Sequence, residues 1–380
     1  MALLNFTSEH NDYRKRLNLF LEKEVIPHSE KWEKDHIVPK DIWRKMGKAG
    51  FLCPTVPKDY GGMGYDFLYS VIVAEELARS NQCGLIPSLH SDIVVPYIVS
   101  YGSEEIKKKY LPGCISGDII TAVAMTEPGA GSDLSSISTT AVEEDDCIVI
   151  NGTKTFISNG INCDLVIVAA KDPEINDPYN SLSLYIVENG TSGFEKGRHL
   201  EKMGLHSQDT SELFFSKCKI PKENILGTKG MGFIMLMEKL QQERLITALL
   251  AVFACQQMID WTIDYCKKTK KSGKPLSKFQ AAQFSIIEML TEIKMAKAFV
   301  DQLVYDHMQK KQIVAETSMA KYKTTDLAKQ IASQCLDLLG DFGIVEKCVI
   351  VRAFRDVRIM SIFAGTNEIM KQIAAKFIGL

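Results

Sequence analysis

The chain has 380 residues, of which 24% are charged, and its formal net charge at pH 7 is -2. This length allows two or three domains with substantial cores, and the near-zero net charge excludes a basic field for a nucleic acid or an acidic membrane. Apolar stretches such as residues 245–255 are too short to span a bilayer, and the N-terminus has neither a signal-peptide core nor an Arg-rich transit pattern. We therefore expect a cytoplasmic protein without a membrane span.

The ten cysteines are scattered along the chain, and no two of them form a CxxC pair. This spacing gives no support for a zinc site or a dithiol redox motif. We expect reduced, mostly buried thiols and no bound metal.

Residues 8–118 follow a helical pattern, in which Leu17, Phe20 and Leu21 recur at steps of three and four. From 119 to about 226 the period shortens to that of strands, predicted at 119–124, 147–150, 154–158, 165–170, 182–187 and 212–215. The dipeptide Asn151-Gly152 predicts a hairpin turn between two of these strands.

From residue 230 onward the pattern is helical again, with long amphipathic runs at 233–268, 279–307, 318–339 and 367–377. A helical, then β-rich, then helical order predicts an α+β protein in three parts. We place an N-terminal α-helical domain at 1–120, a middle β domain at 121–228 and a C-terminal helical bundle at 229–380.

A glycine-rich segment at residues 125–133, Met-Thr-Glu-Pro-Gly-Ala-Gly-Ser-Asp, directly follows the first predicted strand. Gly129 and Gly131 let the backbone approach a ligand closely, and Thr126 and Ser132 add hydroxyls. Such a strand end suits a polar ligand, as in phosphate-binding turns, but the spacing alone fits an ordinary surface turn equally well.

Glu243 lies on a predicted helix, and helical steps place it on one face with Leu236, Leu240, Thr247 and Leu250. A carboxylate on a mostly apolar face is desolvated, which raises its pKa and suits it to proton abstraction near neutral pH. The alternative is an ordinary helix carboxylate paired with Lys239, four residues earlier.

The segment at 125–133 resembles the flavin-binding signature of the acyl-CoA dehydrogenase family, and the resemblance runs from Leu4 to Leu380, nearest to the long-chain branch. It implies a helical N-terminal domain, a β domain and a four-helix bundle. It also implies FAD-dependent α,β-dehydrogenation of an acyl thioester, in which a glutamate removes the α-proton and flavin N5 accepts the β-hydride.

The resemblance also identifies the base. Most family members carry it in a Glu-Gly-Thr motif, but the matching residues here are Ala364, Gly365 and Thr366. The long-chain and isovaleryl branches place their glutamate in a Glu-Arg-Leu context, which Glu243-Arg244-Leu245 matches. We therefore predict Glu243 as the catalytic base.

Further site residues follow from the same resemblance, with Phe156 against the flavin ring and Ser158 hydrogen-bonding near N5. The predicted FAD-binding residues are Met125, Thr126, Gly131, Ser132, Phe156, Ser158, Gln280, Gly340, Thr366, Asn367 and Glu368. The predicted substrate-binding residues are Ser132, Gln242, Arg244 and Gly365.

The adenosine end of the FAD site departs from the family pattern. Thr269 and Ser272 replace an arginine and a phenylalanine, and Asp337 and Asp341 enter a segment that lies near the pyrophosphate of a neighbouring subunit in the family. Four lysines flank Thr269, the position where the family has an arginine; they are Lys267, Lys268, Lys270 and Lys271. They either restore positive charge there or form a solvated surface. We predict FAD that is held more loosely than usual or through altered contacts.

Two alternatives remain open. The substrate is either acyl-CoA or an acyl group on an acyl- or peptidyl-carrier protein of secondary metabolism, because both carriers present the same pantetheine thioester. Alternatively, the chain is a non-catalytic family member that has lost its cofactor. The resemblance further implies electron transfer to an electron-transfer flavoprotein and a homodimer or homotetramer.

Overall fold

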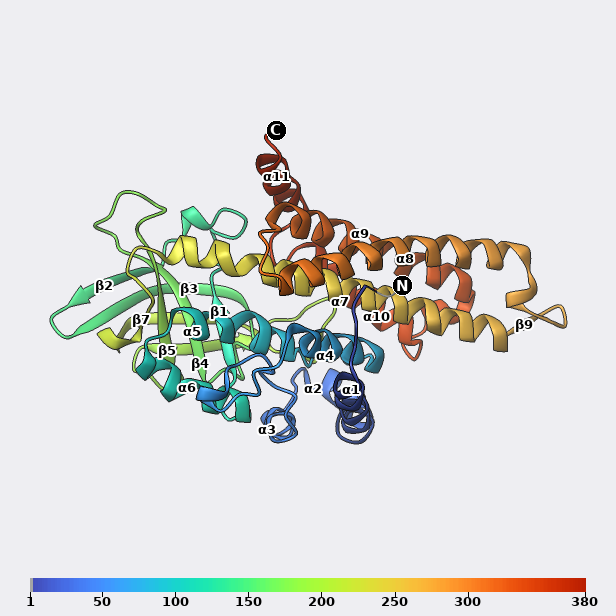
Figure 1. The fold of residues 1–380 in the computed structure, drawn as a ribbon, viewed down its shortest axis with the longest axis horizontal. Coiled ribbons are helices and arrows are strands. Elements are labelled where there is room, and N and C mark those ends of the chain that lie inside the picture. Colours follow the sequence, from blue (N-terminus) through green and yellow to red (C-terminus); the bar gives the residue numbers. More distant parts are fainter. Residues whose placement is uncertain (1–2) are drawn as a thin grey trace.

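The computed structural model describes residues 3–380 and confirms the α+β order of a helical segment, a β-sheet and a helical bundle (Figure 1). The sheet lies at one end of the elongated molecule, the N-terminal helices lie along one side, and the long C-terminal helices extend to the other end. The division at residues 120 and 228 stays a prediction.

The N-terminal part consists of short helices that pack around an aromatic and aliphatic core. They are α1 (Ser8–Phe20), α2 (Ser29–Asp35), α3 (Lys40–Lys48), α4 (Phe67–Ser80), α5 (Val95–Tyr101) and α6 (Glu104–Ser116). The Asp66 carboxylate caps α4 by accepting a hydrogen bond from the Leu68 amide at 2.9 Å. Single-turn π-helices at Leu21–Val25 and Leu89–Val94 interrupt the regular helices.

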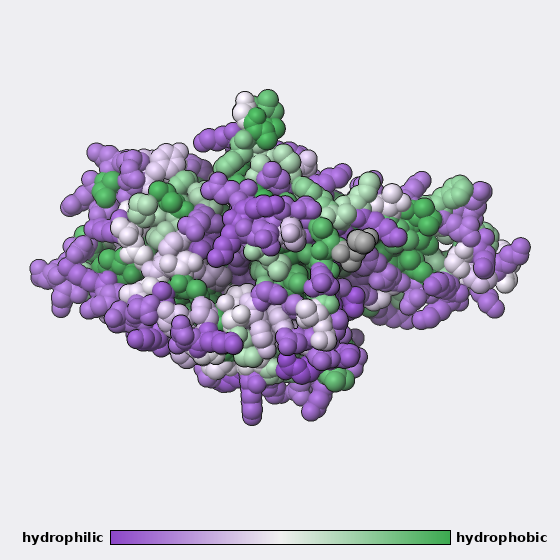
Figure 2. Space-filling view, viewed as in Figure 1, coloured by the Kyte–Doolittle hydropathy of each residue, from purple (hydrophilic) through white to green (hydrophobic). Residues whose placement is uncertain are grey.

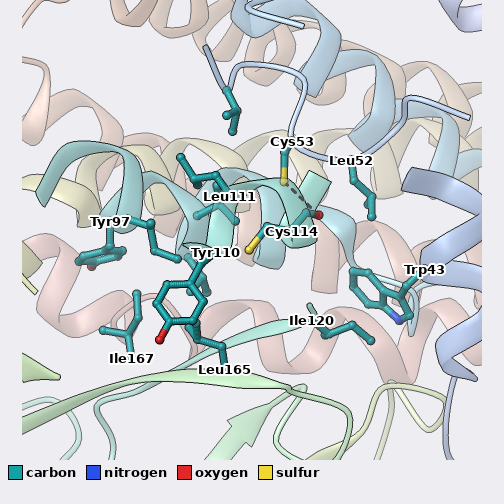
Figure 3. Packing of buried hydrophobic residues seen from close by; sticks show 14 of the residues in the cluster. Trp43, Leu52, Cys53, Tyr97, Tyr110, Leu111, Cys114, Ile120, Leu165 and Ile167 are labelled. Atoms are coloured by element: carbon teal, nitrogen blue, oxygen red, sulfur yellow. Dashed lines mark hydrogen bonds between the residues drawn. The ribbon is translucent and has the colours of Figure 1, made fainter. Parts of the chain in front are cut away.

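The same core joins these helices to the sheet. Trp43, Tyr97 and Leu111 from the helical part share one buried cluster with Leu165 and Ile167 of a central strand (Figure 3). This packing fixes the helical part against the first strands, where the glycine-rich segment begins.

The sheet has the strand order β6-β7-β3-β2-β4-β5-β8, and β1 pairs in parallel with β4. Its strands are β1 (Thr121–Ala124), β2 (Thr140–Glu144), β3 (Cys147–Ser158), β4 (Leu165–Lys171), β5 (Leu182–Glu188), β6 (Phe194–His199), β7 (Thr210–Pro221) and β8 (Ile225–Leu226).

The predicted turn at Asn151-Gly152 is wrong. β3 runs straight through these residues, and its register against β7 shifts between Ile150 and Gly152, which marks a bulge. Glycine is required there because a Cβ on Gly152 would lie 2.4 Å from Thr139 Oγ1. The dipeptide therefore serves a close approach between strands instead of a chain reversal.

The C-terminal bundle is built on α7 (Gly232–Lys268), α8 (Gln280–Met308) and α9 (Val314–Leu339). The small strands β9 (Lys270–Lys271) and β10 (Lys274–Pro275) form a hairpin at its far end. Two shorter helices complete the bundle: α10 (Val349–Val357), which the sequence pattern missed, and α11 (Asn367–Phe377).

Helix α7 is long and apolar enough to cross a membrane, judged by length and composition alone. However, 61% of its most apolar stretch is buried inside the protein. The apolar residues of α7 instead pack against α4, α8 and α9, as in a core helix.

Candidate functional site

The glycine-rich segment forms a tight loop directly after β1. The Glu127 amide donates to the Ala130 carbonyl at 2.8 Å, and the Ala130 amide donates back at 3.2 Å. The Thr155 amide donates to the Thr126 carbonyl at 2.9 Å, so the loop is fastened to β3. Met125 and Thr126 remain partly exposed, while Gly131 and Ser132 are exposed. The predicted ligand-facing residues therefore lie at the surface of a fixed turn.

A buried ion pair holds this turn. Lys154 is 0% exposed, and its Nζ lies 2.8 Å from Glu127 Oε1 and donates to the Met125 carbonyl at 3.0 Å. Glu127 also accepts hydrogen bonds from the Ser138 and Thr139 amides at 2.7 and 3.0 Å. Burial acts to raise the pKa of Glu127, but Lys154 and these donors outweigh it and hold the pKa at about 2.

Phe156 stands out on β3 because its φ is 57° and its side chain is 66% exposed. The register against β7 shifts between Lys154 and Ile157, so a bulge turns Phe156 away from the regular alternation. A left-handed conformation is strained for an aromatic residue, and such outliers concentrate at functional sites. Ser158, two residues on, pairs with Thr210 and is partly exposed.

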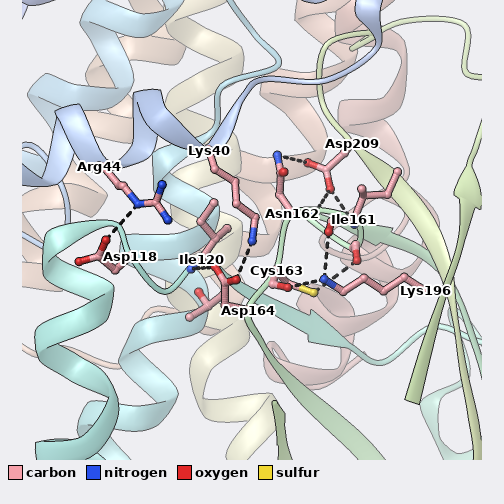
Figure 4. A network of polar contacts seen from close by, with 12 residues as sticks. Lys40, Arg44, Asp118, Ile120, Ile161, Asn162, Cys163, Asp164, Lys196 and Asp209 are labelled. Carbon is pink, nitrogen blue, oxygen red and sulfur yellow. Dashed lines mark hydrogen bonds and ion pairs between the residues drawn. The ribbon is translucent and has the colours of Figure 1, made fainter. Parts of the chain in front are cut away.

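The loop after Ser158 is fastened by charged groups (Figure 4). Asp209 Oδ2 accepts hydrogen bonds from the backbone amides of Ile161 and Asn162, at 2.8 and 2.9 Å. Lys196 Nζ donates to the carbonyls of Ile161 and Cys163 at 3.0 and 2.5 Å. These bonds fix the end of β3 and so fix the Phe156 and Ser158 positions.

Glu243 lies on α7 and is partly exposed as a residue, but its Oε2 atom is buried without a hydrogen-bond partner within residues 3–380. Desolvation raises the pKa of Glu243 to about 7, against the opposing effects of Arg244 and Lys321. The alternative pairing with Lys239 is wrong, because Lys239 Nζ donates to Ser100 Oγ at 2.7 Å. A buried acceptor with a pKa near neutrality suits a general base.

The neighbours of Glu243 on α7 are also constrained. Arg244 is only 3% exposed, and its Nε atom lacks a hydrogen-bond partner in the described part of the chain. The Gln242 side chain donates from Nε2 to the Asp92 carbonyl at 2.6 Å, which ties α7 to the π-helix Leu89–Val94. A buried acceptor and a buried donor that are adjacent in sequence and have no hydrogen-bond partner among residues 3–380 indicate a place for a polar ligand.

The segment at residues 364–368 lies at the start of α11. Ala364 and Gly365 both have left-handed backbones, with φ of 56° and 90°. Thr366 caps the helix by accepting the Ile369 amide at 3.3 Å, Asn367 is buried, and Glu368 is exposed. Since Ala364 has no ionisable side chain, position 364 cannot supply a base.

Lys321 of α9 joins that segment to the base, a connection the sequence did not reveal. Its side chain is 0% exposed, and Nζ donates to the Gly365 carbonyl at 2.6 Å and to Asn367 Oδ1 at 3.2 Å. The ammonium also acts on Glu243 electrostatically. Glu243 and the 364–368 segment are therefore brought together by α9.

Gln280 and Gly340 lie far from Glu243 and the 364–368 segment within one chain. Both are exposed at the far end of the bundle, where α8 begins and α9 ends. At a rise of about 1.5 Å per residue, the stretch of α7 from Glu243 to Lys268 is about 38 Å long. The predicted site residues therefore fall into two sets.

Comparison with known proteins identifies the family. Sequence profiles of the acyl-CoA dehydrogenase N-terminal, middle and C-terminal domains match residues 7–118, 122–218 and 230–379. The chain belongs to the acyl-CoA dehydrogenase family. It is 43% identical over 374 residues to the mitochondrial long-chain specific acyl-CoA dehydrogenase of Mus musculus, covering 98% of this chain and 87% of that protein.

Solved structures agree with this assignment. The acyl-CoA dehydrogenase of Geobacillus kaustophilus has a TM-score of 0.97 at 50% identity, covering 99% of both chains. A chain in a structure of the electron transferring flavoprotein of Acidaminococcus fermentans has a TM-score of 0.94 at 32% identity, covering 99% of both chains. The prolyl acyl carrier protein oxidase AnaB has a TM-score of 0.90 at 28% identity, covering 99% of this chain and 100% of that chain.

Acyl-CoA dehydrogenases are FAD-dependent, and this acyl-CoA dehydrogenase family oxidoreductase has residues that fit a flavin ring. The exposed ring of Phe156 and the partly exposed Ser158 and Thr126 lie on a fixed turn and a bulged strand. A Cβ on Gly131 would approach only Thr126 Cγ2, at 3.9 Å, so the backbone there is open to a ligand. Aromatic and hydroxyl groups of this kind suit a planar, hydrogen-bonding ring system.

Proposed function

We propose that the protein catalyses the FAD-dependent α,β-dehydrogenation of an acyl thioester, acyl-CoA to trans-2-enoyl-CoA, with Glu243 as the base. The observation that carries this proposal is the buried Oε2 of Glu243, which has no hydrogen-bond partner in the described part of the chain, together with the pKa of Glu243, which desolvation raises to about 7. A structural carboxylate at such a position would instead be expected to have its own hydrogen-bond donors.

In this proposal Glu243 Oε2 accepts the α-proton of the thioester, and the resulting carboxylic acid later releases this proton to solvent. When bound, FAD supplies the acceptor for the β-hydride. Desolvation raises the pKa of Glu243, and the positive charge of Arg244 lowers it. Arg244 therefore keeps part of the Glu243 population ionised at pH 7. Gln242 holds the register of α7 through Asp92. Ser132 is proposed to lie near the thioester and Arg244 near the acyl or pantetheine portion, and Gly365 is a further substrate-binding residue of this proposal.

The flavin contacts are assigned by the resemblance and supported by the geometry of the turn. Phe156 offers an exposed ring, and Thr126 and Ser158 offer hydroxyls beside it. The remaining cofactor residues are Met125, Gly131, Thr366, Asn367 and Glu368, with Gln280 and Gly340 acting on the flavin of a second copy.

A second copy is part of the proposal because α8 exposes an apolar stripe. Phe284, Ile287, Met295 and Phe299 are 58%, 60%, 56% and 38% exposed and lie within an arc of about 120° on the helix. Apolar side chains are visible over the bundle in Figure 2. An exposed stripe of this size on a soluble enzyme fits a homodimer or homotetramer.

The carrier of the acyl group remains a choice between two. The likeness to the prolyl acyl carrier protein oxidase AnaB favours a carrier-protein substrate as the second candidate, and the greater identity to a long-chain acyl-CoA dehydrogenase favours acyl-CoA. We also propose an electron-transfer flavoprotein as electron acceptor and a cytoplasmic location, the latter in line with an acyl-CoA dehydrogenase relative from Bacillus subtilis.

The visible absorption spectrum of the purified protein, followed by anaerobic addition of acyl-CoA, tests the proposal. Flavin bands that bleach with acyl-CoA support it, and bands that bleach only with acyl-carrier protein support the second carrier. A protein that stays colourless after FAD is supplied would support the non-catalytic alternative. Retained bleaching in Glu243→Gln would reject Glu243 as the base.

A further inference from the structure

Lys321 is a fully buried lysine on α9, and nothing in its sequence context marks it for the reaction. Its Nζ donates to the Gly365 carbonyl at 2.6 Å and to Asn367 Oδ1 at 3.2 Å. A buried ammonium is costly unless it is paired or hydrogen-bonded, so a lysine kept here without an ion-pair partner within 4.0 Å in residues 3–380 needs an explanation.

The bonded segment is strained. Ala364 has a φ of 56°, which disfavours a residue with a Cβ, and Gly365 follows with a φ of 90°. Such a backbone persists only when its surroundings over-determine it. Lys321 does this by holding the Gly365 carbonyl, while Asn367 is held by Thr325 Oγ1 at 3.1 Å and by Asp326 Oδ1 at 2.9 Å.

The same ammonium acts electrostatically on the proposed base. The charged groups that act on Lys321 are Asp326, Glu243, Arg244 and Glu368, and those that act on Glu243 are Arg244 and Lys321. Glu243 therefore has one cation beside it on its own helix and a second on α9. Arg244 follows from the sequence motif, but only the fold supplies Lys321.

We propose that Lys321 is a positioning residue for the dehydrogenation: it holds the turn at Ala364 and Gly365 in place and sets a positive charge beside Glu243 that keeps this base ionised at neutral pH. The proposal rests on the proposed function of Glu243. One side chain has both roles, because Nζ of Lys321 donates to the Gly365 carbonyl and also carries the positive charge.

The test is the pH profile of kcat/KM for flavin-loaded enzyme with acyl-CoA. Removing the cation raises the pKa of Glu243, so Lys321→Gln moves the acid limb to higher pH by about one unit, and activity at pH 6.5 falls about tenfold while most of it returns at pH 9. Lys321→Arg retains the charge and leaves the limb near its original position. Thr325→Val removes a neighbouring hydrogen bond to Asn367 without changing charge and serves as the matched control.

An acid limb that does not move in folded, flavin-loaded Lys321→Gln overturns the proposal, as does an equal loss at every pH. If Lys321→Gln does not fold, Asn367→Asp places a carboxylate against the ammonium and must shift the limb in the same direction; an unshifted limb there also overturns it. Wild-type enzyme that shows no bleaching with any acyl thioester would instead reject the proposed function itself.

Discussion

The two ends of the bundle present opposite kinds of site. Around Glu243, one chain supplies an environment in which Glu243 Oε2 and Arg244 Nε are buried. At the far tip, Gln280, Gly340, Asp337 and Asp341 are all exposed. A buried group has its pKa set by its own chain, whereas an exposed group has its environment set by solvent or by whatever binds. The proposed function therefore places the chemistry in the first region and proposes that the second region helps to retain the cofactor of a second copy.

Replacing the base tests the region around Glu243 most severely. Glu243→Gln should lower turnover by about 10²- to 10⁴-fold, because an amide cannot accept the α-proton. Flavin content, read from the visible spectrum, should stay unchanged. Glu238→Gln on the exposed side of α7 is the control, and a comparable loss in that variant would contradict the assignment.

Breaking the buried pair of Lys154 and Glu127 tests whether the glycine-rich turn, which we propose contacts the flavin, depends on this pair. Lys154→Met leaves Glu127 buried and unpaired, which should destabilise the fold by about 3 to 5 kcal/mol. Urea unfolding measures this loss. Lys219→Met removes the surface pair between Lys219 on β7 and Glu144 on β2, at 3.7 Å, and should cost less than about 1 kcal/mol. Equal losses in the two variants would show that the buried pair is not special.

The pH dependence of activity makes the comparison between the two ends of the bundle sharper. Of these two regions, we expect only the one around Glu243 to titrate near neutral pH. The base must be deprotonated to act, and the pKa of Glu243 is about 7. Activity should therefore rise with pH through about 7, with roughly a tenfold loss one unit below the pKa. A profile flat from pH 5 to 8 would contradict a desolvated base. The same raised pKa also means that Glu243 costs stability as pH rises from 4.5 through 7.

The smallest effect is expected at the tip. Lys270 and Lys271 lie on the β9–β10 hairpin and are exposed, beside the positions where the family has an arginine and a phenylalanine. Replacing both by alanine should weaken FAD binding by a few-fold to about tenfold, because exposed charges are screened. Fluorescence titration of the apoprotein measures this change. An unchanged affinity would show that these lysines form only a solvated surface, and Lys108→Ala is the control.

The sequence predicted the apolar face of the helix that carries Glu243, but it did not predict the long-range contacts that hold the site in place. The apolar face of α7, with Leu236 and Leu240, follows helical spacing and needed no tertiary information. The long-range partners could not be predicted, since Lys154 and Glu127 are 27 residues apart and Lys321 and Gly365 are 44 apart. No local pattern connects such residues.

The strand bulges show the other limit. Asn151-Gly152 has the composition of a hairpin turn, yet β3 continues through it because Gly152 meets Thr139, the residue that precedes β2. Phe156 likewise alternates as an ordinary strand residue in sequence, and only the register shift reveals its exposure. Backbone conformation of this kind is set by the neighbouring strands and is absent from composition.

Helix α7 is unbroken from Gly232 to Lys268, so it fixes the separation and the relative direction of the base and the tip. An insertion of one residue after Glu243 would rotate everything beyond it by about 100° and advance it by about 1.5 Å. The β9–β10 hairpin, which carries Lys270 and Lys271, would then lie on another side of the molecule. Length changes in this helix should be far less tolerated than substitutions, and relatives that differ here should differ by side chain and not by residue count.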